Sequence, residues 1–273
     1  LTGLPPYAHL AERHTHDRLR VGYSSPDLCR HVVAGFSQAL FHDYDRRRFA
    51  VYAYANCEED AVSRDLAAVA DGWRNLRGLS PAEAARIIYE DEIDILVDLA
   101  GHTGNNLLPV LAYRPAPVQL SGIGYFATTG LSAVDYFLTD ETTALPGEEA
   151  FFTEQLLRLP HSHLCYTPLG APLRPVTPPP FQQAGYVTFG SLNQFDKVTE
   201  EVLSAWGEIL RRLPTARLFL KGSVFDDVTQ RNRIDQRLLD SGLPLDRVDR
   251  EGYTADYYAA YDRIDIALDS YPY

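Results

Sequence analysis

The sequence predicts an α/β fold made of two doubly wound lobes with parallel sheets, of which the second is incomplete. Short apolar runs alternate with helical patterns along both halves of the chain, which is the rhythm of parallel strands joined by crossover helices. A proline-rich stretch at 168–180 separates the two series, and such a stretch suits neither a helix interior nor a central strand. The second series has about four strands, where a complete lobe commonly has about six.

Each element of the first lobe is expected from its local pattern. One helix has a clear start, because Ser80 is a good N-cap, Pro81 follows at the first helical position and Glu83 completes a capping box. The expected helices are 32–41, 61–70 and 81–89. The expected strands are 19–23, 49–54, 73–76, 93–99, 118–123, 136–139 and 156–159.

The second lobe repeats the alternation after the proline-rich stretch. The strands that can be delimited there are 186–189, 216–220 and 264–268, and the expected helices are 199–213, 230–239 and a short one at 257–261. We therefore divide the chain into a lead-in at 1–17, a first lobe at 18–167, a semi-rigid linker at 168–183 and a second lobe at 184–273. The chain contains no methionine and stops just after a strand-like run, so we expect a fragment of a longer protein.

Composition narrows the class of protein. The formal net charge is −12, which argues against a nucleic-acid-binding surface because such a surface needs a basic face. Three widely spaced cysteines, Cys29, Cys57 and Cys165, do not make a disulfide framework and suit a reducing cytoplasm. No apolar run approaches the roughly 18–20 residues that span a bilayer, so we expect no membrane partner.

Polar residues gather after three expected strands of the first lobe, and loops that follow parallel strands share one edge of the sheet. The convergence predicts a site there. The residues concerned are Ser24, Ser25, Asp27 and His31 after the first strand, Gly101, His102, Thr103, Gly104, Asn105 and Asn106 after strand 93–99, and Gly124, Tyr125, Thr128, Thr129 and Gly130 after strand 118–123.

Two histidines are the sharpest candidates in these loops. His102 lies between Gly101 and Gly104, where it could act as a general base or orient a hydroxyl, or could make only a structural hydrogen bond. His31 lies at the expected start of a helix, whose dipole favours the neutral imidazole, and the alternative is an ordinary surface histidine.

In the second lobe a polar loop with one lysine, Lys197, follows the strand-like run 186–189 and precedes a helix. A cation beside a helix N-terminus suits an anionic phosphate. The alternative is a solvated loop lysine. The tyrosines of the stretch 253–261 could stack on a base, although half-buried packing is more common at that spacing. They are Tyr253, Tyr257, Tyr258 and Tyr261.

Other chemistry is not favoured. The pairs His161/His163 and His14/His16 have no neighbouring Cys or acidic cluster with ligand spacing, so we expect no metal site. The chain also has no P-loop, no intact Gly-x-Gly-x-x-Gly and no nucleophile elbow.

Six sequence motifs resemble those of the catalytic region of the O-linked N-acetylglucosamine transferases and their SPINDLY-like bacterial relatives, glycosyltransferase family 41. One such motif would be weak evidence of kinship, but the six occur in the family's order and cover nearly the whole chain. The motifs are 19–27 with His31, 98–104, 114–119 with 122–130, 135–140, 189–197 and 265–269.

The resemblance implies a GT-B glycosyltransferase, with two Rossmann-like lobes and the active site between them. Residues 18–167 would be the catalytic lobe and 184–273 the nucleotide-sugar-binding lobe. Such enzymes invert the anomeric centre and need no metal or other cofactor. The donor would be UDP-N-acetylglucosamine (UDP-GlcNAc) and the acceptor a Ser or Thr hydroxyl of a protein or peptide. Upstream tetratricopeptide repeats would present that acceptor.

The resemblance also implies roles for individual residues. Lys197 would stabilise the leaving diphosphate, and His31 and His102 would line the acceptor and sugar side, either of them as base or orienter. The donor-binding residues would be Thr103, Gln194, Asn193, Tyr125 and Tyr257.

Two departures from the family pattern keep alternatives open. Relatives often have a histidine where this chain has Tyr257, which leaves nucleotide preference undecided, with GDP-fucose as the other donor. The chain also stops before the glycine- and threonine-rich turn that binds donor phosphates in the family. A non-catalytic nucleotide-sugar-binding or scaffold domain is therefore a second alternative, and an unrelated two-lobe epimerase a third.

Overall fold

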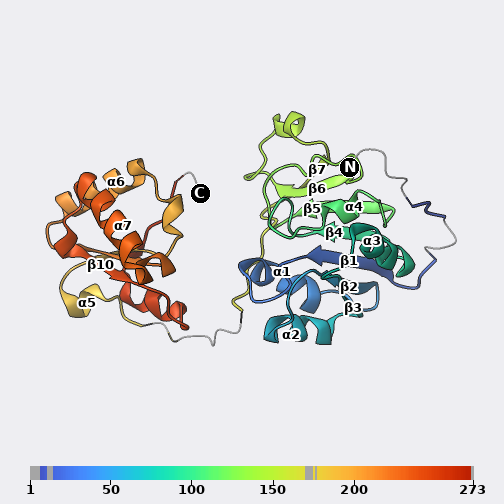
Figure 1. Cartoon of the computed structure of the whole chain (residues 1–273), viewed down its shortest axis with the longest axis horizontal. Helices are drawn as coiled ribbons and strands as arrows, with labels where there is room; N and C mark the ends of the chain where they lie inside the picture. Colours follow the sequence, from blue (N-terminus) through green and yellow to red (C-terminus); the bar gives the residue numbers. More distant parts are fainter. Residues whose placement is uncertain (1–6, 11–14, 170–174, 176, 272–273) are drawn as a thin grey trace. The chain divides into compact units, whose positions relative to one another are not determined.

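The computed structural model describes residues 7–10, 15–169, 175 and 177–271. The chain divides into two compact units, Leu1–Gly170 and Ala171–Tyr273, which Figure 1 shows in blue to yellow and in yellow to red. Part of the expected lead-in and part of the expected linker lie outside the described residues, as does His14. The assignment of one lobe to catalysis and the other to nucleotide-sugar binding stays a prediction.

The first unit is built on a parallel sheet of seven strands in the order β3-β2-β1-β4-β5-β6-β7. The order reverses between β1 and β4, because the chain steps outward on one side from β1 to β3 and on the other from β4 to β7 (Figure 1). The strands are β1 (Leu19–Ser25), β2 (Phe49–Ala55), β3 (Gly72–Asn75), β4 (Ile95–Asp98), β5 (Val118–Gly122), β6 (Tyr136–Asp140) and β7 (Gln155–Leu159).

Helices cover both faces of this sheet, as the alternating pattern predicts. The helices α1 (Val32–His42) and α2 (Ala61–Val69) bury Phe41 and Leu66 in one apolar cluster with Val51. On the opposite face α3 (Pro81–Glu90) and the short α4 (Leu108–Leu111) bury Ile88 and Leu111 against Leu96. Alternate side chains of a strand point to opposite faces, so the two clusters hold the sheet from both sides.

The second unit has a parallel sheet of four strands in the order β10-β9-β8-β11. Its order reverses between β8 and β11. The strands are β8 (Thr188–Ser191), β9 (Arg217–Lys221), β10 (Val248–Glu251) and β11 (Ile266–Ala267). The helices α6 (Glu200–Arg212) and α7 (Val228–Asp240) pack on one face, and a 3₁₀ turn, η6 (Tyr258–Arg263), packs Ala260 on Phe219 of the other. A short helix, α5 (Phe181–Ala184), precedes the sheet.

Several local expectations need correction. Ser24 and Ser25 are the buried end of β1, so they do not belong to the loop that follows it. The short helix expected at 257–261 is the 3₁₀ turn Tyr258–Arg263, with Tyr257 just before it. The strand β10 was not expected, because its run Val-Asp-Arg-Glu is mostly charged and becomes a strand by pairing with β9.

Candidate functional site

The site predicted in the first unit lies where the strand order reverses. β4 pairs directly with β1 on one side and with β5 on the other, so the loops after all three strands leave the same edge. In open α/β sheets, ligands bind at the carboxyl edge beside the point where the strand order reverses. The structure therefore confirms that the loops carrying His31, His102 and Tyr125 are neighbours.

His31 is the N-cap of α1, and 46% of its side chain is exposed. Its Nδ1 accepts a hydrogen bond from the backbone N–H of Val33 at 3.3 Å and lies 3.5 Å from Asp27 Oδ1. An imidazole that caps a helix is held in one orientation. Both of these contacts are made by Nδ1, so the Nε2 edge is the candidate for contact with a hydroxyl.

Asp98 ends β4 and is completely buried. Its Oδ2 accepts hydrogen bonds from Ser121 Oγ at 2.7 Å and from the N–H of Gly101 at 2.8 Å, while Oδ1 accepts from the N–H of Ala100 at 3.3 Å. Burial raises the pKa of Asp98 to about 6, although the hydrogen bonds oppose this effect. The carboxyl group thus fixes the turn that carries His102. Asp98 was not among the predicted site residues, and the signal for it in the sequence is a charged residue at the end of an apolar run.

His102 is exposed, and its ring is set by the loop after β5. Its Nε2 lies 3.1 Å from the carbonyl oxygen of Thr128. The ring of Tyr125 meets the imidazole edge-on, with 5.5 Å between ring centres. Gly101 has φ +54°, and a Cβ there would lie 2.5 Å from Tyr125 Cβ, so glycine is required on both grounds.

Gly124 lies where the three loops pack against one another. A Cβ placed on it would lie 2.0 Å from the carbonyl oxygen of Leu99 and 3.4 Å from Val33 Cγ2. Leu99 precedes the His102 turn, and Val33 lies two residues after His31. The backbone at Gly124 therefore sets how closely both histidine loops approach the loop of Tyr125.

Thr103 has an unusual hydroxyl group. Its Oγ1 is buried and has no hydrogen-bond partner among the described residues. A buried hydroxyl normally has a partner, because its desolvation is otherwise uncompensated. This observation supports the predicted contact between Thr103 and a bound ligand.

In the second unit the predicted donor loop follows β8, which lies beside the reversal between β8 and β11. Lys197 is exposed and ends the 3₁₀ turn Phe195–Lys197, two residues before Thr199 caps α6. The chain has one other lysine, Lys221, whose side chain is 2% exposed and whose Nζ lies 2.7 Å from Glu251 Oε1. Lys197 is therefore the lysine that solvent and ligands can reach.

Two of the other predicted donor residues anchor this loop. Asn193 Nδ2 donates to Asp269 Oδ1 at 2.7 Å, which ties the loop after β8 to the segment after β11. The hydroxyl of Tyr257 donates to the carbonyl oxygen of Leu192 at 3.1 Å. The structure thus brings Asn193 and Tyr257 to the same loop, although nothing in the sequence pattern linked them.

Two cavities flank the loop. One of about 280 Å³ is lined by Asn193, Gln194, Gly222 and Ser223, among others. The second, of about 340 Å³, is lined by Asn193, Tyr261 and Asp269, among others. Asn193 borders both cavities, and Gln194 is exposed toward the first.

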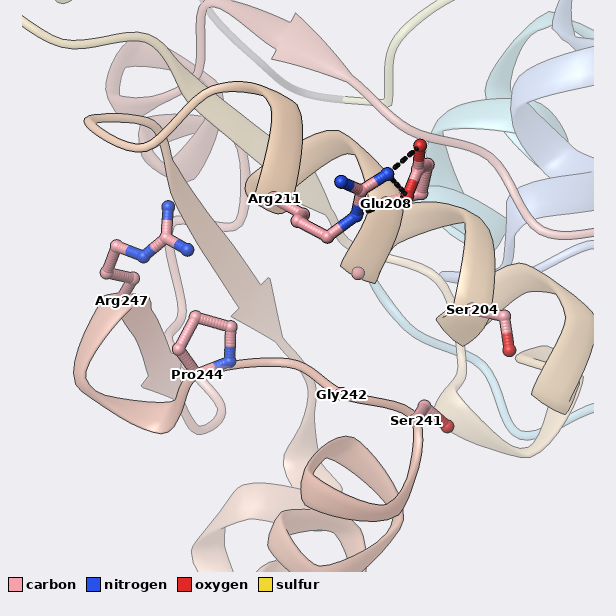
Figure 2. Close-up of a pocket in the computed structure, with 8 residues that line it drawn as sticks. Ser204, Glu208, Arg211, Ser241, Gly242, Pro244 and Arg247 are labelled. Atoms are coloured by element: carbon pink, nitrogen blue, oxygen red, sulfur yellow. Dashed lines mark hydrogen bonds and ion pairs between the residues drawn. The ribbon is translucent and has the colours of Figure 1, made fainter.

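A larger cavity, of about 430 Å³, lies away from the donor loop (Figure 2). It is lined near the end of α6 by Glu208 and Arg211 and across from them by Arg247. Arg211 pairs with Glu208, and Arg247 Nη1 donates to the carbonyls that close α6, including that of Leu210 at 2.9 Å. These contacts stabilise the helix end. The cavity extends along α6 from Ser204 to Arg211, and none of the residues that line it belongs to the loop of Lys197.

The described residues contain no group of three His, Cys, Asp or Glu side chains that could hold a metal ion, and His14 of the pair His14/His16 lies outside them. His163 is instead buried with its Nδ1 2.6 Å from Asp140 Oδ2, at the end of β6. Hydrogen bonds from the His163 side chain and backbone lower the pKa of Asp140. None of the helices in the described segments is long and apolar enough to cross a bilayer.

Comparison with known proteins agrees with this geometry. The family model for glycosyl transferase family 41 matches residues 1–166. The chain is 40% identical over 265 residues to the probable UDP-N-acetylglucosamine–peptide N-acetylglucosaminyltransferase SPINDLY of Petunia hybrida, covering 94% of this chain and 28% of that protein. It is 30% identical over 232 residues to the corresponding probable enzyme SEC of Arabidopsis thaliana, covering 80% of this chain and 24% of that protein. The chain thus spans less than a third of these relatives.

Solved structures agree as well. An O-GlcNAc transferase mutant from Thermobaculum terrenum aligns with a TM-score of 0.89 and 36% identity, covering 99% of this chain and 52% of that one. The lipopolysaccharide galactosyltransferase WaaB aligns with a TM-score of 0.56 and 10% identity, covering 92% and 73%, which is a likeness of fold alone. The fold predicted from the sequence, GT-B with two Rossmann-like lobes, is confirmed. On the match to its family model, this chain belongs to glycosyltransferase family 41.

Proposed function

We propose that this protein is an inverting glycosyltransferase that moves N-acetylglucosamine from UDP-GlcNAc to Ser and Thr hydroxyls of other proteins. Relatives at 40% and 30% identity are named for this activity. The observation that carries the proposal is that each sheet places a predicted site loop beside the reversal of its strand order, with His31 and His102 in one unit and Lys197 in the other. Such positions are where α/β sheets bind ligands.

In the proposed reaction the acceptor oxygen attacks the anomeric carbon while the bond from that carbon to the diphosphate breaks. UDP leaves with the bonding electron pair, so its negative charge increases as the reaction proceeds. The ammonium group of Lys197, exposed beside the start of α6, stabilises that charge. An electrostatic contact that strengthens in the transition state accelerates the reaction.

The hydroxyl proton must leave the acceptor during the attack. His31 and His102 are the proposed partners on the acceptor and sugar side, either of them as base or orienter. Thr103 and Tyr125 are proposed to contact the sugar, and Gln194, Asn193 and Tyr257 the nucleotide or phosphates. The unpartnered hydroxyl of Thr103 and the exposed Gln194 beside a cavity support these roles.

We propose that no metal ion takes part, because Lys197 supplies the positive charge that a divalent cation supplies in other transferases. Transfer in the presence of excess chelator should equal transfer in its absence. A requirement for added Mg²⁺ or Mn²⁺ would contradict this part of the proposal.

The decisive assay compares donors on one acceptor peptide. We expect transfer from UDP-GlcNAc and none from GDP-fucose. Transfer from GDP-fucose alone would reassign the donor and keep the protein transferase. Binding of UDP-GlcNAc without transfer by the full-length protein would favour a scaffold role instead.

We also propose that the full-length protein carries tetratricopeptide repeats before this region and works in the cytoplasm. Its free cysteines, Cys29, Cys57 and Cys165, suit a reducing compartment. Reading the coding sequence upstream of Leu1 tests the first point, and cell fractionation tests the second.

A further inference from the structure

The hydrogen bond between His102 and Thr128 identifies the proton on the imidazole ring. His102 Nε2 lies 3.1 Å from the carbonyl oxygen of Thr128. A carbonyl oxygen can only accept a hydrogen bond, so Nε2 must donate. The neutral ring then carries its lone pair on Nδ1.

The carbonyl group of Thr128 is itself held from its other side. Thr128 C=O and Thr129 N–H belong to one peptide group, which is planar and trans, so the two bonds point in opposite directions. The N–H of Thr129 donates to Glu154 Oε1 at 2.8 Å. A carboxylate that fixes this N–H therefore aims the carbonyl at His102.

Glu154 is well placed for that task. It is 5% exposed and immediately precedes β7. Its Oε1 also accepts from the Thr129 hydroxyl, and its Oε2 accepts from Thr128 Oγ1 at 2.7 Å. Burial alone would raise the pKa of Glu154, but these hydrogen bonds lower it below its ordinary value, so the group is an ionised acceptor at neutral pH.

We propose that Glu154 is a positioning residue that acts through the Thr128–Thr129 peptide to hold His102 in the Nε2–H tautomer, with Nδ1 as the nitrogen that accepts a hydrogen bond from a substrate hydroxyl. Ionised Glu154 also polarises the peptide, which strengthens its carbonyl as an acceptor. The inference deepens the proposed function and rests on it, since it names which nitrogen of His102 faces the substrate.

The test begins with the unsubstituted protein. Histidine labelled with ¹⁵N is examined in alkaline buffer, where an ordinary imidazole is neutral, and His102→Asn assigns the His102 signals. We expect a protonated Nε2 and an unprotonated Nδ1. The opposite tautomer would overturn the proposal without any need for a variant that folds.

Substitution then separates positioning from simple packing. Glu154→Ala should give a mixture of His102 tautomers. It should lower kcat about tenfold, which is less than the loss expected when an acid–base group itself is removed. The KM for UDP-GlcNAc should stay within about twofold of that of the unsubstituted protein. Glu154→Gln retains an acceptor for the Thr129 N–H, so it should restore the Nε2–H tautomer and most of kcat. Glu141→Ala, at an exposed acidic residue after β6, is the matched control and should behave as the unsubstituted protein.

The outcomes separate the two proposals. Glu154→Ala with an unchanged tautomer and unchanged kcat would overturn the role of Glu154. An Nε2–H tautomer in a protein that transfers no sugar would instead count against the proposed function and leave the His102 geometry standing.

Discussion

The Oδ2 atom of Asp98 lies 2.8 Å from the backbone nitrogen of Gly101, and this hydrogen bond closes the turn that carries His102. The carboxyl group is fully buried and accepts three hydrogen bonds, from Ala100, Gly101 and Ser121. The site thus depends on a carboxyl group whose ionised form is destabilised by burial and stabilised only in part by its hydrogen bonds.

This relationship predicts a pH dependence of stability. Burial raises the pKa of Asp98 to about 6 in the folded chain, against about 3.9 when unfolded. Between these values the folded state holds the proton that the unfolded state has released, so the free energy of unfolding falls as pH rises from about 4 to about 6. The loss is about 3 kcal/mol.

Asp98→Asn removes this titration and retains an acceptor for the Gly101 N–H. Urea unfolding of both proteins at several pH values should show the unsubstituted protein losing stability relative to Asp98→Asn across that window. Parallel stability profiles would refute the assignment.

Lys197→Ala should lower kcat for transfer about 10²–10³-fold, the loss typical of a removed electrostatic contact to the transition state. Lys197→Arg keeps the charge and should recover part of the rate. The exposed Glu201 in the first turn of α6 offers a control, because Glu201→Ala removes a neighbouring charge of the other sign. Initial rates with an acceptor peptide measure all three, and near-normal turnover by Lys197→Ala would sink the proposed mechanism.

Gly124→Ala should destabilise the first unit by about 3 kcal/mol, the upper part of the usual overpacking range, because the added methyl group meets the Leu99 carbonyl at 2.0 Å. Gly104→Ala is the matched control, since its Cβ has no neighbour within 4 Å, and it should change stability by less than about 0.5 kcal/mol. Thermal or urea unfolding distinguishes them. Equal stability of the two variants would mean that the three loops do not pack tightly at Gly124.

Tyr257→Phe removes the hydroxyl that donates to the Leu192 carbonyl. A neutral hydrogen bond contributes about 1 kcal/mol, so the KM for the donor should rise about fivefold while kcat changes little. Tyr253→Phe serves as the control, since Tyr253 is 73% exposed. Donor saturation curves measure the effect, and matching KM values for the two variants would remove Tyr257 from the donor site.

Much of the fold could be predicted because its signals are local. The apolar run before Ser24 and the capping box at Ser80 specify a strand and a helix without knowledge of their neighbours. The charged strand β10 could not be predicted in this way, because its ladder with β9 and the ion pair of Arg217 with Asp249, at 2.9 Å, hold it in place.

The candidate site could be predicted only in part, for a related reason. His31, His102 and Lys197 stand out because each lies in a polar loop that follows a strand. Glu154 and Asp98 do not stand out, because their importance lies in contacts across 25 and 23 residues of sequence, to Thr129 and Ser121. Only the assembled sheet brings those partners together.

The two lysines differ in whether a modifying enzyme could reach them. Lys221 is buried against Glu251, whereas Lys197 is exposed. An acetyl group or ubiquitin attached to one of these two lysines would therefore be placed on Lys197. Either modification would remove the positive charge that the proposed reaction requires.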